Sequence, residues 1–134
     1  MSLMQVLKDA LGDVNVIAED LGFLTDGVRR LLHDSGFPGM KVIQFAFDSR
    51  EESDYLPHNY EKNCVVYTGT HDNDTLCGWY KVLDPEDLKL SQKYMNNANT
   101  PKRQIHWDFI RLALASVEAM CLITLKDNLG LGRE

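Results

Sequence analysis

Short apolar runs alternate with amphipathic segments along this chain, a pattern typical of α/β proteins. Each run is rich in β-branched or aromatic residues, is bounded by polar or turn residues, and is too short for a buried helix, so it predicts a strand. The segments between the runs repeat apolar residues at every third or fourth position and therefore predict helices. The predicted strands span residues 14–18, 39–47, 64–67 and 119–125, and the predicted helices span residues 4–11, 26–35, 75–83, 85–95 and 100–118.

Turn and capping residues mark the ends of several predicted helices. Thr25 is placed to cap the second helix, and Gly36 is placed to end it. Asp74 or Thr75 caps the helix that follows the third strand, and we favour Asp74. Pro85 suits the first position of the next helix, because proline lacks the amide proton that is unused there.

Strands that alternate with helices predict right-handed βαβ units and a parallel sheet. A (β/α)8 barrel carries its active site on the carboxyl face of its strands and needs about 250 residues. This chain has 134 residues and four predicted strands. The sequence therefore predicts the fold class α/β, with parallel βα units that form about half of a TIM (β/α)8 barrel in one domain spanning residues 1–134.

Acidic residues follow each of the four predicted strands. In a parallel sheet these ends meet at one edge, so we expect the carboxylates after the first and third strands to face one site. The acidic residues are Glu19 and Asp20, Asp48, Asp72 and Asp74, and Asp127.

Two carboxylates in different surroundings suit the cleavage of a glycosidic bond. Glu19 follows an apolar run, and partial burial there would raise its pKa and suit a general acid. Asp72 lies among donors from His71, Asn73 and Thr75, which would keep it ionised. A simpler interpretation stays open, in which Glu19 and Asp20 are loop carboxylates that cap the following helix.

The run from His71 to Asp74 could also hold a metal ion. It lacks the glycine and glutamate positions of an EF-hand loop, and the chain has no pair of Cys or His residues at zinc spacing, so a metal site is disfavoured. The aromatic pair Trp79-Tyr80 could stack on a sugar but is more simply part of a core. His106 and Trp107, on a predicted helix, are expected to be packing residues.

Composition excludes several classes of function. The chain carries a formal net charge of −6, whereas binding to nucleic acid needs a basic face. It has no apolar run of membrane-spanning length and opens with no signal-peptide pattern, so no membrane is expected as a partner. Its three cysteines, an odd count, are expected to be free thiols in a reducing compartment, and we expect a cytoplasmic location.

Four motifs occur in an order that resembles the 4-α-glucanotransferases, also called amylomaltases or disproportionating enzymes, a branch of the α-amylase-like barrels. The resemblance runs from about Val14 to Gly132. The motifs are Ala18-Glu19-Asp20-Leu21-Gly22, Pro38-Gly39-Met40-Lys41-Val42 with Gln44-Phe45-Ala46-Phe47, Leu56-Pro57-His58-Asn59-Tyr60, and Tyr67-Thr68-Gly69-Thr70-His71-Asp72-Asn73-Asp74-Thr75.

This resemblance implies a retaining transglycosylase that transfers segments of α-1,4-glucan between maltooligosaccharides through a covalent glycosyl-enzyme. It implies that Glu19 is the general acid/base and that Asp72 is a third carboxylate that stabilises the transition state. His71 would bind the same sugar as Asp72, and Asp20 and Phe45 would line the glucan groove. The family needs no cofactor and no metal.

The chain also departs from the family pattern. Family members are several times longer, and their nucleophilic aspartate belongs to an arginine-rich motif that does not occur before Glu19. The resemblance therefore implies the carboxyl half of a catalytic barrel, strands five to eight, which is inactive alone. An exposed half-barrel is expected to self-associate through its open strand edges and apolar face. The alternative is a non-catalytic glucan-binding module.

Overall fold

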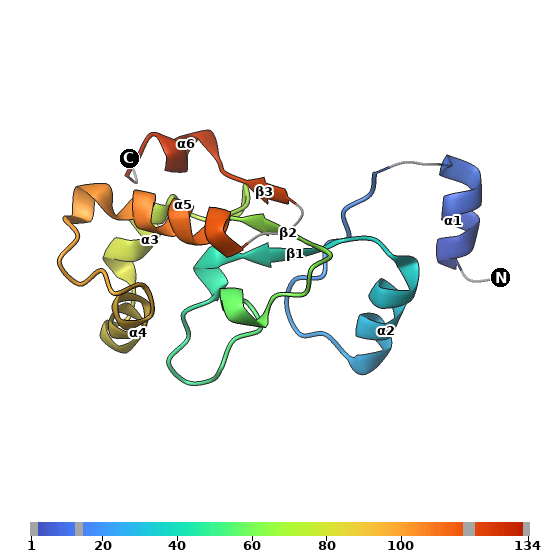
Figure 1. Ribbon diagram of the computed structural model, residues 1–134, viewed down its shortest axis with the longest axis horizontal. Coiled ribbons are helices and arrows are strands. Elements are labelled where there is room, and N and C mark those ends of the chain that lie inside the picture. The colour runs from blue at the N-terminus through green and yellow to red at the C-terminus, as the bar shows by residue number, and fades with distance from the viewer. Residues whose placement is uncertain (1–2, 13–14, 117–119, 133–134) are drawn as a thin grey trace. The chain divides into compact units, whose positions relative to one another are not determined.

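The structure is a computed structural model that describes residues 3–12, 15–116 and 120–132. Its internal contacts divide the chain into two compact units, residues 1–40 and residues 41–134. Each unit is described by itself below, and Figure 1 labels the helices and strands of both.

The first unit contains two helices, α1 (Leu3–Leu11) and α2 (Asp26–Ser35). The hydroxyl of Thr25 accepts a hydrogen bond from the amide of Val28 at 3.4 Å and so caps α2. Gly36 ends this helix in the left-handed region at φ 67°, where glycine carries no steric cost. Both predicted helices of this region are therefore confirmed, together with the predicted cap and stop of the second.

The predicted strand over residues 14–18 is wrong for residues 15–18, which do not form a strand in the structure. Val14 lies outside the described residues. The segment is held by a backbone hydrogen bond from the Ala18 amide to the Pro38 carbonyl, at 2.9 Å. Side-chain burial still alternates along it, with Val16 and Ala18 half-buried and Ile17 exposed. The apolar pattern thus corresponds to a segment whose side chains alternate in burial, rather than to a strand of a sheet.

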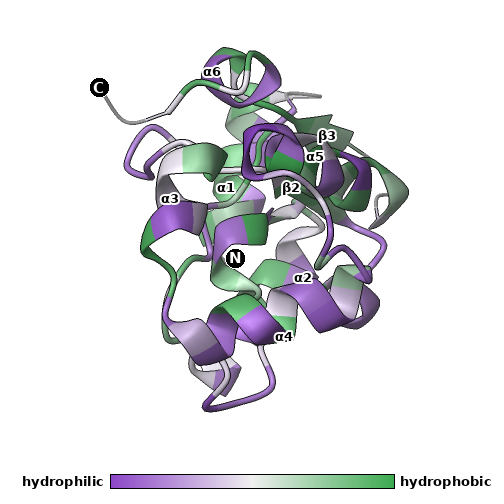
Figure 2. Ribbon diagram, turned by 90° about the vertical axis from the view of Figure 1, so that its left-hand side faces the viewer, coloured by the Kyte–Doolittle hydropathy of each residue, from purple (hydrophilic) through white to green (hydrophobic). Residues whose placement is uncertain are grey.

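Three strands form a sheet in the order β1 (Gly39–Val42), β2 (Cys64–Tyr67) and β3 (Met120–Leu122), as Figure 1 shows. Strands β2 and β3 are parallel, and Val66 pairs with Cys121. The predicted parallel α/β sheet is confirmed in this part of the chain, and the bounds of β2 agree with the prediction. Figure 2 shows β2 and β3 in hydrophobic shades; the β2 residues Cys64, Val65 and Val66 are buried, whereas Met120 and Leu122 of β3 are exposed.

Two predicted strands are too long. The run expected to continue to Phe47 leaves the strand after Val42 and enters the 3-10 helix η1 (Ile43–Phe45), closed by a 3.0 Å hydrogen bond from the Ala46 amide to the Ile43 carbonyl. The run expected to end at Leu125 stops at Leu122, because Thr124 caps the short helix α6 (Leu125–Asn128). Residue 119, where this strand was expected to begin, lies outside the described residues.

The remaining helices are α3 (Leu76–Val82), α4 (Pro85–Met95) and α5 (Ile105–Ser116), with the 3-10 helices η2 (Pro57–Asn59) and η3 (Lys102–Gln104). Pro85 opens α4 as predicted, and the Asp84 side chain caps it. The helix predicted from residue 100 begins at Ile105, because Pro101 first leads into η3. Residues 117 and 118, at its predicted end, lie outside the described residues.

Phe109 of α5 is the centre of the core in the second unit. Its ring is fully buried and lies edge-on to the rings of Phe47, Trp79 and Tyr80, at centroid distances of 5.2 to 5.9 Å. These geometries are the ones that aromatic pairs prefer. The interpretation of Trp79 and Tyr80 as core residues is therefore confirmed.

The three cysteines are free, as expected, and Cys64 and Cys77 are buried whereas Cys121 is half-buried. Burial raises the pKa of the Cys77 thiol and that of the Cys121 thiol, so both stay protonated to higher pH than an exposed cysteine. None of the helices over the described residues is long and apolar enough to cross a membrane.

Candidate active site

The loop from Thr68 to Thr75 connects the carboxyl end of β2 to α3 and carries two of the predicted site residues. Its first residue is fixed from α6. The Thr68 hydroxyl donates to Oδ2 of Asp127 at 2.7 Å, and Oδ1 of Asp127 accepts the amide of Leu76, also at 2.7 Å. Thr68 and Asp127 are both almost fully buried. One carboxylate thus ties both ends of the loop to a third element.

A second buried side chain, that of Gln44 in η1, supports the loop. Nε2 of Gln44 donates to the carbonyl oxygen of Asp74 at 2.9 Å. Gly69 leaves the room that this amide needs, because a Cβ atom built there would lie 2.7 Å from the Gln44 Nε2. Gln44, the polar residue inside the apolar run from Val42 to Phe47, therefore stabilises the loop and is not part of a strand.

The tip of the loop is a turn closed by Thr70 and Asn73. Oδ1 of Asn73 accepts hydrogen bonds from the Thr70 amide at 2.9 Å and from its hydroxyl at 2.8 Å. The Asn73 amide returns a bond to the Thr70 carbonyl at 3.2 Å, and the Asp72 amide lies 3.3 Å from the Thr70 hydroxyl oxygen. This turn displays the two residues between Thr70 and Asn73 on a fixed backbone.

Those two residues are His71 and Asp72, and both point into solvent. Their side chains are 91% and 82% exposed, and Nε2 of His71 lies 3.3 Å from Oδ1 of Asp72. Of the three donors expected around Asp72, only His71 is beside it, because Asn73 bonds Thr70 and the Thr75 hydroxyl accepts from Gly78. Among the described residues, no three His, Cys, Asp or Glu side chains are grouped so as to hold a metal ion.

The cap of α3 is Thr75 and not Asp74, which corrects the favoured assignment. The Thr75 hydroxyl accepts from the Gly78 amide at 3.1 Å, as an N-cap does. The carboxylate of Asp74 instead accepts the amide of Thr75 at 2.8 Å and lies against Gly78, where a Cβ atom would collide with it.

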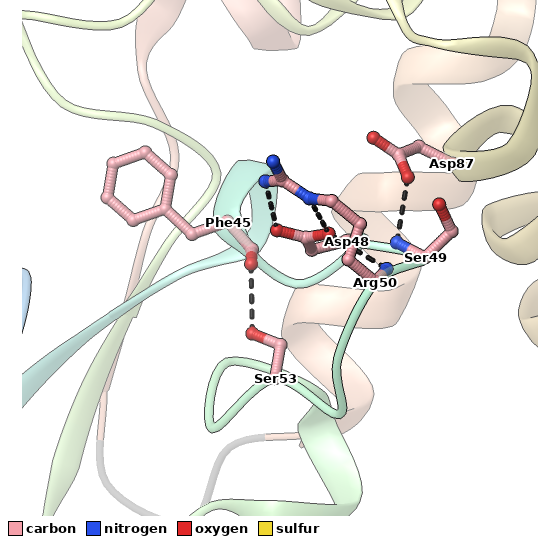
Figure 3. Close-up of polar contacts among 6 residues, drawn as sticks. All are labelled: Phe45, Asp48, Ser49, Arg50, Ser53 and Asp87. Carbon is pink, nitrogen blue, oxygen red and sulfur yellow. Dashed lines mark hydrogen bonds and ion pairs between the residues drawn. The ribbon is translucent and has the colours of Figure 1, made fainter.

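Phe45, the predicted groove residue, follows β1 on η1 and is 40% exposed. Figure 3 shows its ring pointing away from Asp48 and Arg50. The ring meets that of Tyr55 edge-on at 5.4 Å, and the Ser53 hydroxyl donates to the Phe45 carbonyl at 2.9 Å. An exposed aromatic ring on a tethered backbone is suited to contact with a ligand.

Asp48, another acidic residue after a predicted strand, is paired within its own loop. Arg50 donates to both carboxylate oxygens, at 2.8 and 2.6 Å, as Figure 3 shows. These hydrogen bonds lower the pKa of Asp48 to about 2, and the carboxylate in turn raises the pKa of Arg50. The Ser49 amide donates to Asp87 at the start of α4, which ties the loop to that helix. We therefore assign this group a structural role.

Glu19 and Asp20 belong to the first unit and are placed differently from one another. Glu19 is exposed, so the predicted partial burial is wrong: it lies on the outward side of the alternating segment over residues 15–20. Asp20 is half-buried, and its Oδ1 accepts the amide of Met40 at 2.6 Å. It also occupies the space beside Gly39 where a Cβ atom would be. The alternative capping role is wrong too, because Thr25 caps α2.

The structure therefore brings His71 and Asp72 together, whereas Glu19 and Asp20 lie in the other unit and their shared site stays a prediction. Sequence reasoning missed the buried supports of the loop, Gln44 and the carboxylate of Asp127. The sequence carries a signal for each, since Gln44 is a polar residue inside an apolar run and Asp127 is an acidic residue directly after a predicted strand. His106 is buried, with its ring 3.8 Å from the Cys77 sulfur, as the packing interpretation requires.

A family model described as 4-alpha-glucanotransferase matches residues 1–134. The 4-alpha-glucanotransferase of Clostridium butyricum is 45% identical over 135 residues, covering 100% of this chain and 27% of that protein. The protein of the same name from Synechocystis is 47% identical and covers 97% of this chain and 26% of the relative. The chain thus spans about a quarter of the length of the curated relatives that it matches.

A solved structure leads to the same family. The amylomaltase from Streptococcus agalactiae, in complex with acarbose, superposes with a TM-score of 0.84 at 37% identity, covering 95% of this chain and 26% of that one. The amylomaltase from Corynebacterium glutamicum shares the fold with a TM-score of 0.64 at 16% identity, covering 87% of this chain and 22% of that one. The motifs, the parallel sheet and these relatives agree, and the chain belongs to the 4-alpha-glucanotransferase family.

Proposed function

We propose that this chain supplies part of the catalytic domain of a 4-alpha-glucanotransferase and does not catalyse the reaction alone. The observation that carries the proposal is the display of His71 and Asp72 on the cross-linked loop between β2 and α3. The hydrogen bonds described above within this loop use neither of these two side chains. Five other polar side chains hold the backbone of the loop in place, namely those of Gln44, Thr68, Asn73, Thr75 and Asp127. Such an arrangement suits groups that must meet a substrate in a fixed position.

In the complete enzyme Glu19 acts as the acid/base. It protonates the glycosidic oxygen as the first sugar chain leaves, and then takes a proton from the 4-hydroxyl of the acceptor. Asp72 stays ionised and stabilises positive charge on the sugar ring in the transition state, and His71 binds the same sugar. Asp20 and Phe45 line the groove for maltooligosaccharide. The nucleophile that forms the covalent glycosyl-enzyme comes from sequence outside these 134 residues.

The similarity to an amylomaltase solved with acarbose supports a glucan as the ligand class. In the first unit, the bond from Asp20 to the Met40 amide supports a role for Asp20 in holding the segment that carries Glu19. We retain the prediction that the chain corresponds to strands five to eight of a barrel. We also retain self-association as a prediction, which the exposed side chains of Leu114, Met120 and Leu122 support.

A chimera tests the catalytic proposal. The matching segment of the Clostridium butyricum relative is replaced by this chain, and disproportionation of maltotriose is measured. We expect an active chimera, about a 1,000-fold loss of kcat in E19Q and in D72N, and unchanged activity in the surface control D54N. A folded chimera without activity, or full activity in E19Q and D72N, would contradict the proposal.

The isolated chain provides a separate test of its inactivity. We expect it not to disproportionate maltotriose, because the double displacement cannot begin without its nucleophile. Clear turnover by the pure chain would overturn this part of the proposal. The alternative, a glucan-binding module, predicts measurable binding of maltooligosaccharide by the isolated chain through Phe45 and His71, which F45A and H71A would remove.

A further inference from the structure

A pocket of about 360 Å³ opens between the connection after α4 and the first turns of α5. Its volume is at the lower end of the range for small-molecule sites, about 300 to 1,000 Å³. Most of its lining is amide, hydroxyl and charged side chains, with one tryptophan. Among its lining residues are Asn97, Thr100, Gln104, Trp107, Asp108 and Arg111, and none of the residues assigned above to glucan binding lines it.

The backbone around this pocket is fixed by local hydrogen bonds. Asn96 ends α4 in the left-handed region at φ 52°, and the Thr100 amide donates to the Asn97 carbonyl at 2.9 Å. The Gln104 amide donates to the Pro101 carbonyl at 2.7 Å. The pocket is therefore formed before any ligand arrives, which lowers the entropy cost of binding.

One wall of the pocket is a hydrogen-bonded chain of three side chains. The carboxylate of Asp108 accepts from Nδ2 of Asn97 at 2.9 Å and from Nη1 of Arg111 at 3.1 Å. Asn97 is 8% exposed, and its Oδ1 is buried without a hydrogen-bond donor in the part of the chain that the structure describes. The Asp108 carboxylate, which accepts these two bonds, keeps further lone pairs for a bound hydroxyl group.

Trp107 adds an aromatic surface to this wall, and its side chain is 43% exposed. This exposure corrects the expectation that Trp107, like His106, is a packing residue. A tryptophan face beside amides, a carboxylate and a guanidinium matches a pyranose ring, which has an apolar face and a rim of hydroxyl groups. An anion is disfavoured by Asp108, and a purely apolar ligand is disfavoured by the polar lining.

We propose that this pocket is an accessory site for a glucose unit of a maltooligosaccharide, with Trp107 stacking on the ring and Gln104 and Asp108 bonding its hydroxyl groups. The pyranose class comes from the lining of the pocket, whereas the choice of glucose rests on the proposed function. The site uses none of the residues assigned to catalysis and holds the chain of a long glucan rather than its cleaved bond.

Two tryptophans make the test direct, because the chain contains only Trp79 and Trp107. The full chain is labelled with ¹⁵N at tryptophan and titrated with maltose, and W107F assigns the two indole signals. We expect the Trp107 signal to shift in a saturable manner and the signal of Trp79, in the core, to stay. Calorimetry should show binding of maltotriose weakened about tenfold in D108N and in Q104A, the effect of one hydrogen bond.

The control variant is L114A, which removes an exposed side chain from the same helix outside the pocket and should leave binding unchanged. No saturable shift of Trp107 with maltose, an equal shift with glycerol, or binding unaffected by both D108N and Q104A would overturn the inference. An active chimera, together with a Trp107 indole signal that does not shift with maltose, would overturn this inference and leave the proposed catalytic function in place. A Trp107 response beside an inactive chimera would remove the proposed catalytic function alone.

Discussion

The Thr68 hydroxyl donates a 2.7 Å hydrogen bond to the carboxylate of Asp127, across 59 residues of sequence and with both side chains buried. The same carboxylate accepts the amide of Leu76 at the start of α3. A buried carboxylate is costly unless its oxygens are used, and here each accepts a strong bond. This acid therefore holds the loop of His71 and Asp72 from behind rather than taking part in its chemistry.

Substitution of Asp127 should lower the free energy of unfolding, and the loss should be larger when both carboxylate oxygens are removed than when one is kept. D127A leaves the Thr68 hydroxyl and the Leu76 amide unpaired, so we expect a loss of about 3 kcal/mol in the free energy of unfolding. D127N keeps one oxygen for the amide, and the Thr68 hydroxyl can turn to accept from the new NH2 group, so we expect about 1–2 kcal/mol. Urea unfolding measures both, and equal losses in the two variants would contradict the argument.

Gly69 and Gln44 provide a second test, based on space rather than charge. A Cβ atom in G69A would lie 2.7 Å from the Gln44 Nε2. We expect G69A to lose about 1–3 kcal/mol of stability, as overpacked positions do. In a Q44A background the obstacle is gone, so the added methyl group should cost much less. A double-mutant cycle by urea unfolding measures the coupling, and additive losses would show that the side chain of Gln44 is not the obstacle.

Local signals in the sequence were sufficient for the elements that neighbouring residues determine. The bounds of β2 and the ends of α2 agree with prediction, because an apolar run, a capping threonine and a left-handed glycine act within a few residues. The position of His71 and Asp72 directly after a buried strand also agrees with the prediction, whereas their role in the chemistry stays a prediction.

Interactions between distant residues decided what sequence reasoning could not predict. The strand expected to reach Phe47 ends early, and Gln44 instead bonds a carbonyl 30 residues away. Asp127 has the sequence context of a strand-end acid, yet its partners are 59 and 51 residues away. Patterns of apolar and polar residues do not encode such pairs, because many partners satisfy the same periodicity.

The pairing of Asp48 and Arg50 predicts a pH dependence at the acidic end of the scale. The pKa of Asp48 falls from 3.8 to about 2 because Arg50 bonds the ionised form. The pair therefore stabilises the fold fully above 3.8, and this contribution is lost as the pH falls through about 2. In R50Q we expect the pKa of Asp48 to rise toward 3.8, with R50K between the two because lysine keeps the charge but not the fork of donors.

A carboxyl ¹³C titration by NMR measures the pKa of Asp48 in each variant. R111Q is the matched control, since it removes an arginine that pairs with Asp108 on α5 and should leave the titration of Asp48 unchanged. An Asp48 pKa that stays near 2 in R50Q would show that another group holds the carboxylate ionised.

His71 and Asp72 should contribute almost nothing to stability, although we assign them the most specific chemistry of the loop. Their side chains are 91% and 82% exposed, and they meet only in an exposed pair at 3.3 Å. We expect H71A and D72N to change the free energy of unfolding by no more than about 0.5 kcal/mol, as exposed substitutions and surface ion pairs do. D127N is the comparison that should lose stability, because Asp127 on α6 bonds both ends of the same loop.

The value of this measurement lies in its combination with the activity of the chimera. A residue that leaves stability unchanged and removes activity acts on the substrate, whereas one that lowers both acts through the fold. We expect D72N to fall in the first group and D127N in the second. A loss of more than about 1.5 kcal/mol in D72N would place the aspartate among the supports of the loop and remove its assignment as the residue that stabilises the sugar in the transition state.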